Sequence, residues 1–332
     1  MQLSIIRRIC LERIMNKMPT AIDLFCGCGG LSLGFQKAGF KIIRAFDNWD
    51  KAVAIYNKNF NHKAELKDAY DITPKYLKSF NPDFIIGGPP CQDYSSAGKQ
   101  DETLGRANLT LRFAELVCAA HTDWFVMENV DRILKSETLP KALKMFKNAG
   151  YGLTQVVLDA SLCGTPQKRK RFFLIGELGG RDNAIKKIIL KDLAAKNMTI
   201  RDYLGREFGT DYYYRHPRSY ARRGIFSIDE PSPTVRGVNR PIPKTYKIHP
   251  GDATKDLSKV RPLTTLERAR IQTFPPTFQF EGSKTDLEQI IGNAVPVELA
   301  AYVGKHILAY LNTPKSYKEF DMEYIQLELK FD

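Results

Sequence analysis

Short runs rich in Ile, Val and Phe alternate with longer helix-like segments through the first half of this 332-residue chain. This alternation is typical of strands joined by crossover helices. Several of the runs are continuously apolar, which suits parallel strands covered by helices on both faces. We therefore expect a doubly wound, mostly parallel α/β sheet. The expected strands are residues 21–25, 41–46, 84–86, 124–127, 154–158 and 171–175.

A second, smaller and more irregular domain is expected after the sheet. The alternation stops after Gly176, and residues 201–259 are rich in Tyr, Arg, Pro and Gly. Helical patterning returns at 264–272 and again at 297–311, so the end of the chain is expected to pack back onto the first domain. The predicted division is 18–178, 179–285 and 286–332.

The charge balance narrows the class of partner. Lys and Arg number 50 against 37 Asp and Glu, a net charge of +13, which favours a polyanionic partner without by itself deciding for nucleic acid. No apolar stretch is long enough to span a bilayer, and the six cysteines form neither a dense disulfide framework nor a zinc pattern. We expect a soluble, cytoplasmic protein with reduced thiols, no metal and no membrane association.

The segment DLFCGCGGL, residues 23–31, leaves the first expected strand and enters a helix over 31–38. Its glycines allow a tight turn and a close approach of the backbone to a ligand at the helix N-terminus. The loop suits a dinucleotide, another nucleoside cofactor or simply a tight turn. Asp47 follows at the tip of the next strand, where a carboxylate can accept hydrogen bonds from ribose. An adenosine-bearing cofactor follows, although this pair does not separate NAD from S-adenosylmethionine.

A cysteine follows another buried strand in the segment GGPPCQ. Cys91 lies just past the carboxyl end of that strand, where active-site groups sit in open α/β sheets. The polar, Gly-containing residues 93–106 have the composition of a mobile loop. Cys91 is either a nucleophile beneath that loop or an inert buried thiol, and on its own each interpretation carries equal weight.

Two further polar groups are expected on the same sheet edge. Glu128 closes a strand, so it is either an acid in a partly dehydrated cleft or an ordinary strand-end carboxylate. In QKRKR, residues 167–171, Arg169 and Arg171 point the same way if the segment is extended, which makes one face cationic. Taken alone, such a charge run is more often a solvated face.

Taken in their order along the chain, six segments of the sequence resemble the successive motifs of the DNA (cytosine-5)-methyltransferases of bacterial restriction–modification systems. The matching segments are DLFCGCGG, GGPPCQ, ENV, QKRKR, RPLTTLERARIQTFP and IGNAVP. The resemblance implies a Rossmann-like domain that binds S-adenosylmethionine, a small target-recognition domain and a C-terminal segment returning to the first domain. It also implies methyl transfer to carbon 5 of a cytosine in double-stranded DNA.

The resemblance assigns the chemistry to named residues. The Cys91 thiolate would add to cytosine carbon 6 while Glu128 protonates the ring nitrogen, which makes carbon 5 nucleophilic. Arg169 would hold the cytosine carbonyl, with Arg171 beside it in the catalytic group. The stacked base would have to flip into the pocket, with residues 93–106 closing over the DNA. Cofactor contacts would come from Phe25, Gly27, Gly29, Gly30, Asp47, Asn48, Asp68, Pro90, Leu109 and Asn293, with Asp71 competing with Asp68 for the adenine.

The region between QKRKR and RPLTT is expected to contact DNA. It interleaves basic and aromatic residues, which suits phosphate contacts and guanine recognition by arginine. Arg222 and Arg223 are the preferred base readers, with nonspecific phosphate contact as the alternative. Thr234 and Val235 resemble the pair that marks the family's recognition domains. The full set of expected DNA contacts is Ser95, Gln167, Arg222, Arg223, Thr234 and Arg236.

Other functions remain as alternatives at this point. A nicotinamide-dependent oxidoreductase explains the Gly loop and Asp47 but gives no role to Cys91 with Glu128. A catalytically silent DNA-binding module explains the charge but not the presence of both reactive groups. A tRNA cytosine-5 methyltransferase is the nearest alternative, because one branch of the family acts on RNA with similar motifs. We expect a monomer, with a cognate restriction endonuclease as its possible functional partner.

Overall fold

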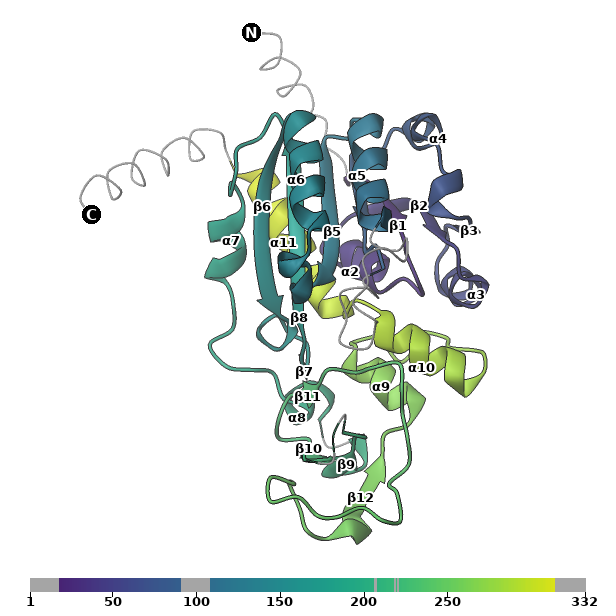
Figure 1. The fold of residues 1–332 in the computed structure, drawn as a ribbon, viewed down its shortest axis with the longest axis vertical. Helices are drawn as coiled ribbons and strands as arrows, with labels where there is room; N and C mark the ends of the chain where they lie inside the picture. Colours follow the sequence, from purple (N-terminus) through teal and green to yellow (C-terminus); the bar gives the residue numbers. More distant parts are fainter. Residues whose placement is uncertain (1–17, 91–107, 206–207, 218, 220, 314–332) are drawn as a thin grey trace, which may run out of the picture.

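The structure is a computed structural model that describes residues 18–90, 108–205, 208–217, 219 and 221–313. A large sheet with helices on both sides forms one part of the molecule, and a smaller part lies below it in the view of Figure 1. Two expected site residues, Cys91 and Ser95, lie outside the described residues, as does the loop expected over residues 93–106.

The large sheet has seven strands in the order β3-β2-β1-β4-β5-β8-β6. Strands β1 to β5 are parallel to one another, and β8 runs antiparallel to both of its neighbours. This arrangement confirms the predicted doubly wound, mostly parallel α/β fold. The sequence did not predict β3, whose three residues are too few for a pattern to emerge. The strands are β1 Thr20–Leu24, β2 Lys41–Asp47, β3 Ala64–Leu66, β4 Phe84–Gly87, β5 Trp124–Val130, β6 Tyr151–Asp159 and β8 Lys170–Leu178.

Helices cover both faces of the sheet, each over its own apolar core. One face packs against α2 (Gly30–Ala38), α7 (Lys186–Lys191) and α11 (Val297–Asn312). The other packs against α4 (Pro74–Ser79), α5 (Asn108–Ala120) and α6 (Thr138–Asn148). The last described helix therefore returns to the sheet, while α7 packs on the sheet even though it follows the predicted boundary at residue 178.

The smaller part is built around a three-stranded sheet in the order β10-β9-β12. A third apolar core joins this part to the Gly-loop side of the large sheet, because Ile200 and Phe226 belong to the same cluster as Val53 and Phe60. No helix in the described part of the chain has the length and apolar composition needed to cross a membrane. The remaining elements are α3 Asp50–Asn59, α8 Ile200–Leu204, α9 Thr265–Ile271, α10 Lys284–Asn293, β7 Gln167–Lys168, β9 Tyr212–Tyr214, β10 Ile225–Ser227, β11 Ser232–Pro233, β12 Val260–Pro262, and the short 3-10 turns Ala69–Asp71, Asp131–Lys135, Ala160–Leu162 and Leu257–Lys259.

Candidate active site

The candidate site lies at the carboxyl edge of the large sheet, where the strand order reverses. Strand β1 pairs with β2 on one side and with β4 on the other. The chain therefore progresses in opposite directions across the sheet from this point, and such switch points open a crevice at the carboxyl ends of the strands. The Gly loop follows β1, and the Gly-Pro segment that leads to Cys91 follows β4.

The Gly loop has the left-handed backbone that its sequence favours. Positive φ angles occur at Phe25 (62°), Gly27 (53°) and Gly29 (98°). A side chain built at Gly27 would meet no atom within 4 Å, so the backbone is open to a ligand there. A side chain at Gly29 would instead collide with the Phe60 ring at 2.4 Å, and one at Gly30 with the Val295 carbonyl at 2.2 Å. These glycines thus serve different purposes, one ligand access and two internal packing.

Asp47 holds the Gly loop rather than facing the crevice with a free carboxylate. Its Oδ2 accepts from the Gly27 N–H at 2.8 Å, and its Oδ1 accepts from the Trp49 N–H at 2.9 Å. Burial raises the pKa of Asp47, and these backbone N–H groups act in the opposite direction. The predicted ribose contact therefore has to share a carboxylate that already accepts two backbone hydrogen bonds.

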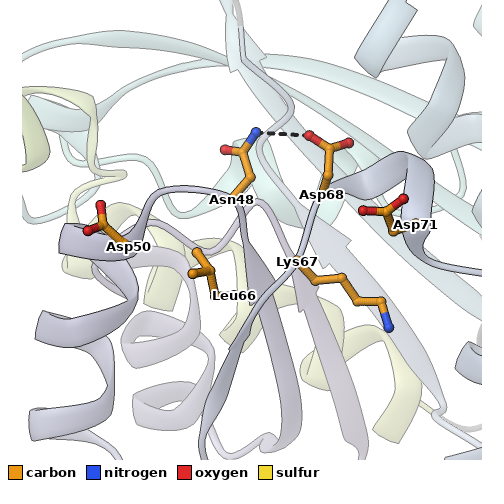
Figure 2. A pocket seen from close by; sticks show the side chains of 6 residues that line it. All are labelled: Asn48, Asp50, Leu66, Lys67, Asp68 and Asp71. Carbon is orange, nitrogen blue, oxygen red and sulfur yellow. Dashed lines mark hydrogen bonds between the residues drawn. The ribbon is translucent and has the colours of Figure 1, made fainter.

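The next residue, Asn48, lines a surface hollow of about 400 Å³ together with Asp68 and Asp71 (Figure 2). The Asn48 Nδ2 donates to Asp68 Oδ2 at 3.1 Å, and Asp68 Oδ1 accepts from the Tyr70 N–H. The hollow offers amide and carboxylate acceptors beside an exposed Leu66 side chain. Asp68 and Asp71, the two candidates for an adenine contact, both line this hollow.

Glu128 is a buried carboxyl group beside a guanidinium. Its Oε1 lies 2.8 Å from Nε of Arg171, which follows from the pairing of β5 with β8. Burial raises the pKa of Glu128, and the nearby Arg171 and Arg169 cations oppose that shift without cancelling it. A carboxyl group with a raised pKa retains its proton more readily near neutral pH, as a general acid requires.

The segment that leads to Cys91 passes directly beside Glu128. A Cβ atom at Gly88 would lie 3.1 Å from Oε2 of Glu128. Asn129, the next residue along β5, donates from Nδ2 to the Pro89 carbonyl at 3.2 Å. The strand pairing of β4 with β5 thus brings the GGPP and ENV segments together, as their expected positions at one sheet edge require.

Arg169 is buried among backbone carbonyl groups. Its guanidinium donates to the carbonyls of Val235 (3.0 Å), Gly292 (3.0 Å) and Ala294 (3.2 Å). Arg171, not Arg169, makes the direct ion pair with Glu128. The contact of Arg169 with the cytosine carbonyl stays a prediction, and in this structure its guanidinium makes these internal hydrogen bonds.

The expected DNA contacts have different environments. Gln167 is fully buried, and its amide accepts from the Val235 N–H and donates to Gln272. Its contact with DNA stays a prediction, and in this structure its side chain makes internal hydrogen bonds. Arg223 pairs with Glu230 and lies over the Phe226 ring, whereas Arg222 is exposed.

Other side chains in the recognition region make internal contacts. The Thr234 hydroxyl donates to the Lys168 carbonyl at 2.8 Å, and Arg236 donates to the His216 carbonyl. Three further expected cofactor residues lie at the ends of elements or of described segments: Pro90 ends the described segment after β4, Leu109 lies at the start of α5, and exposed Asn293 ends α10. Their contacts with the cofactor stay predictions.

The sequence analysis missed several residues that support the site. Asp23 is buried at the end of β1, and its Oδ2 accepts from Ser32 Oγ at 2.6 Å, which in turn accepts from Tyr56. Asn129 and Gln272 were likewise not singled out. Asn129 had a signal in its place next to Glu128, but no local pattern marks a buried amide such as Gln272.

Comparisons with known proteins agree on one family. The model of the C-5 cytosine-specific DNA methylases matches residues 20–309. The Type II methyltransferase M.HindV of Haemophilus influenzae is 56% identical over 88% of this chain and 97% of its own, and M.HgiDI of Herpetosiphon aurantiacus is 55% identical over 89% and 96%. The solved Dnmt2 methyltransferase of S. pombe shares the fold with a TM-score of 0.66 at 18% identity, covering 90% of this chain and 100% of that one.

Proposed function

This chain belongs to the C-5 cytosine-specific DNA methylases, and we propose that it methylates cytosine within a specific duplex sequence by way of a covalent Cys91 adduct. The observation that carries the proposal is the buried Glu128 carboxyl group, which lies beside Arg171 and against the segment that leads to Cys91. The described residues that precede Cys91 therefore pass beside the acid, which supports the proposed pairing of a thiol with Glu128.

Cytosine carbon 5 is a poor nucleophile, so the ring must first be activated. In the proposed mechanism the Cys91 thiolate forms a bond to carbon 6 while Glu128 delivers its proton to ring nitrogen 3. The electron pair of the former 5,6 double bond then becomes available at carbon 5. After carbon 5 has taken the methyl group, it loses its proton to a base, the bond between Cys91 and carbon 6 breaks with the thiolate as leaving group, and nitrogen 3 returns its proton to Glu128, which restores the aromatic ring.

The Glu128 carboxyl group and the cytosine both need a neighbouring side chain that holds them in position. Arg171 is held against Glu128 by strand pairing, so its guanidinium orients the carboxyl group. We assign to Arg171 the contact with the cytosine carbonyl, in place of Arg169. Arg169 acts from further away through its charge, which together with Arg171 opposes the raised pKa of Glu128. The pKa of Glu128 stays raised overall, so the carboxyl group holds its proton more readily, as proton transfer to the cytosine ring requires.

The residues at the carboxyl edge fit S-adenosylmethionine, which supplies an electrophilic methyl group on its sulfonium. The open backbone at Gly27 admits a ligand, and the hollow at Asn48 and Asp68 offers acceptors for ribose and adenine groups. Asp47 would hold the loop through Gly27 rather than bind ribose alone. Phe25, Pro90, Leu109 and Asn293 remain proposed contacts around this edge.

We place the smaller part as the target-recognition unit, with exposed Arg222 as its leading DNA contact. The relatives at 55% and 56% identity are named Type II methyltransferases, which supports a place beside a cognate endonuclease in a restriction–modification system. They also favour duplex DNA over tRNA as the substrate. The cytosine in a duplex is stacked, so the reaction requires the base to be flipped.

The test is transfer of labelled methyl groups from S-adenosylmethionine to duplex DNA, followed by bisulfite sequencing. Cys91→Ala is expected to abolish transfer, whereas the control Cys118→Ala in α5 is expected to retain it. A duplex with 5-fluorocytosine at the modified site should trap a denaturation-resistant complex, because fluorine cannot leave as a cation. Label on tRNA but not on any duplex would overturn the substrate assignment, and transfer by Cys91→Ala would overturn the mechanism.

A further inference from the structure

The QKRKR segment lies where the large sheet meets the smaller part of the molecule. Strand β7 within it pairs in parallel with β11, with Ser232 opposite Gln167 and Pro233 opposite Lys168. Figure 1 shows both short strands at the junction below β8. The pairing ends after two residues, yet the two segments stay attached beyond it.

Side chains continue the attachment at Thr234, whose hydroxyl donates to the Lys168 carbonyl, and at Val235. The N–H of Val235 donates to Gln167 Oε1 at 2.8 Å, and its carbonyl accepts from Arg169 at 3.0 Å. The backbone N–H and the backbone carbonyl of Val235 are therefore both hydrogen-bonded to side chains of QKRKR, the first to Gln167 and the second to Arg169. Val235, Gln167 and Arg169 are all buried, so water does not compete for these bonds.

The same two side chains also hold the link between α10 and α11. Arg169 donates to the Gly292 and Ala294 carbonyls, and Gln167 donates to Gln272, which itself donates to the Ala294 carbonyl. Gly292 packs backbone to backbone on Gly237, because a Cβ there would lie 2.3 Å from the Gly237 nitrogen. The recognition-region segment is thus fixed from two sides.

The third alternate residue of QKRKR is Arg171, the partner of Glu128. We infer that Gln167 and Arg169 are positioning residues that hold the recognition-region segment at Val235 in fixed register with the Glu128–Arg171 pair. The inference rests on the proposed function of Glu128. It implies that correct placement of the target sequence and activation of the cytosine are coupled through one five-residue segment.

The physical reason is geometric. A duplex docked on the smaller part presents its flipped base to Glu128 only if the two parts keep their relative position. Misplacement by about 1 Å can lower a reaction rate about 100-fold even where binding persists. Loosening Val235 should therefore reduce the chemical step more than duplex affinity, and should reduce discrimination between sites.

The experiment compares Gln167→Met and Arg169→Lys with Tyr302→Phe, which removes one hydrogen bond to a backbone carbonyl, from Tyr302 to Ile189, away from this junction. The modified sequence is first read from wild-type product. The single-turnover rate, duplex Kd and Tm are then measured on that duplex and on duplexes with one mismatch. Both junction variants are expected to lose about 10- to 100-fold in rate with duplex Kd within about threefold, and to discriminate less against mismatches.

A rate and a discrimination equal to those of Tyr302→Phe at similar Tm would overturn the inference, as would a loss confined to duplex Kd. Amide hydrogen exchange in the wild type gives a readout independent of any variant. The Val235 N–H is expected to exchange slowly, and fast exchange would contradict the inference that Gln167 and Arg169 hold Val235 in place. Failure of the wild type to methylate cytosine would instead refute the proposed function.

Discussion

At the residue scale, the protein uses burial to adjust carboxyl groups. Glu128 and Asp23 both lie in the sheet and both have raised pKa values, with burial as the main cause. Only Glu128 has a cation as its direct partner, Arg171, whereas Asp23 has the Ser32 hydroxyl. The first arrangement suits proton transfer to a ligand, and the second stabilises the fold below the Gly loop.

Glu128→Gln is expected to slow methyl transfer by roughly 10² to 10⁴-fold, because the amide cannot deliver a proton. Duplex and cofactor affinities should stay close to wild type. The wild-type rate should fall as pH rises through the raised pKa of Glu128, and this limb should be missing in the variant. Single-turnover kinetics across pH checks both points. The control is Glu115→Gln on the exposed side of α5, and equal rates for the two variants would refute the role of Glu128.

Asp23 gives a pH-dependent contribution to stability. Burial raises its pKa from 3.8 to about 7, so the folded state binds the proton more tightly than the unfolded state. This contribution is complete below the unfolded pKa near 4 and is lost as pH rises through about 7. Relative to Asp23→Asn, the wild-type free energy of unfolding should fall in that range by up to about 1.4 kcal/mol per pH unit.

Urea unfolding of both proteins between pH 5 and pH 8 measures this difference. Asp182→Asn is the control, because a hydrogen bond from Lys147 lowers the pKa of that exposed carboxylate and its contribution changes only at lower pH. A constant difference between wild type and Asp23→Asn across the range would contradict the prediction.

At the scale of elements, α2 and α11 form the pair on which the cofactor edge rests. They are far apart in the sequence but pack together on one face of the sheet. Close approach is possible because α2 has a glycine at position 34, where a Cβ would lie 2.4 Å from Ala300 Cβ and 2.5 Å from the Val297 carbonyl. The link before α11 contacts the Gly loop at Gly30 in the same way.

Gly34→Ala should therefore force α2 and α11 apart and lower the free energy of unfolding by about 1–3 kcal/mol. Because α2 begins at the Gly loop, cofactor affinity should fall as well. Thermal unfolding and cofactor titration measure the two effects. Gly179→Ala is the control, since its φ of 66° is strained but open space surrounds it, and it should leave cofactor affinity unchanged. Full stability in Gly34→Ala would show that the helices can adjust.

At the scale of the whole molecule, the smaller part is joined firmly to the large sheet. The third core spans both parts, and Asn59 of α3 exchanges two hydrogen bonds with Gln279. Lys58 also pairs with Glu281 on the same stretch. Apolar packing and polar contacts therefore hold the two parts together.

Substitutions of the adjacent residues Arg222 and Arg223 are expected to affect different properties, DNA binding for the first and stability for the second. Arg222→Gln is expected to weaken duplex binding and to reduce the slope of log K against log salt by about 0.9 if the side chain contacts one phosphate. Arg223→Gln should mainly lower Tm, because it loses Glu230 and Phe226 as partners. Binding isotherms at several salt concentrations with parallel melting curves test this. The reverse pattern would make Arg223 the DNA contact.

The strands of the sheet, the Gly loop and the family could be predicted from the residues alone. Apolar runs and turn residues act locally, so the positions of the strands and of the Gly loop could be predicted, with bounds shifted by a few residues. Glu128 and the segment before Cys91 were placed at one edge because parallel strands align their carboxyl ends. The three-residue β3 was missed because so short a run carries no period.

The partner of each polar side chain became known only from the folded chain. Gln167, Arg169 and Arg171 have similar sequence surroundings, yet two bind backbone groups of distant segments and one pairs with Glu128. Likewise the Asp47 carboxylate is hydrogen-bonded to the Gly loop, while Asn48 lines the surface hollow. The physical reason is that a hydrogen bond depends on which groups the folded chain brings within about 3 Å. Partners that lie 20 or more residues apart in the sequence leave no local pattern.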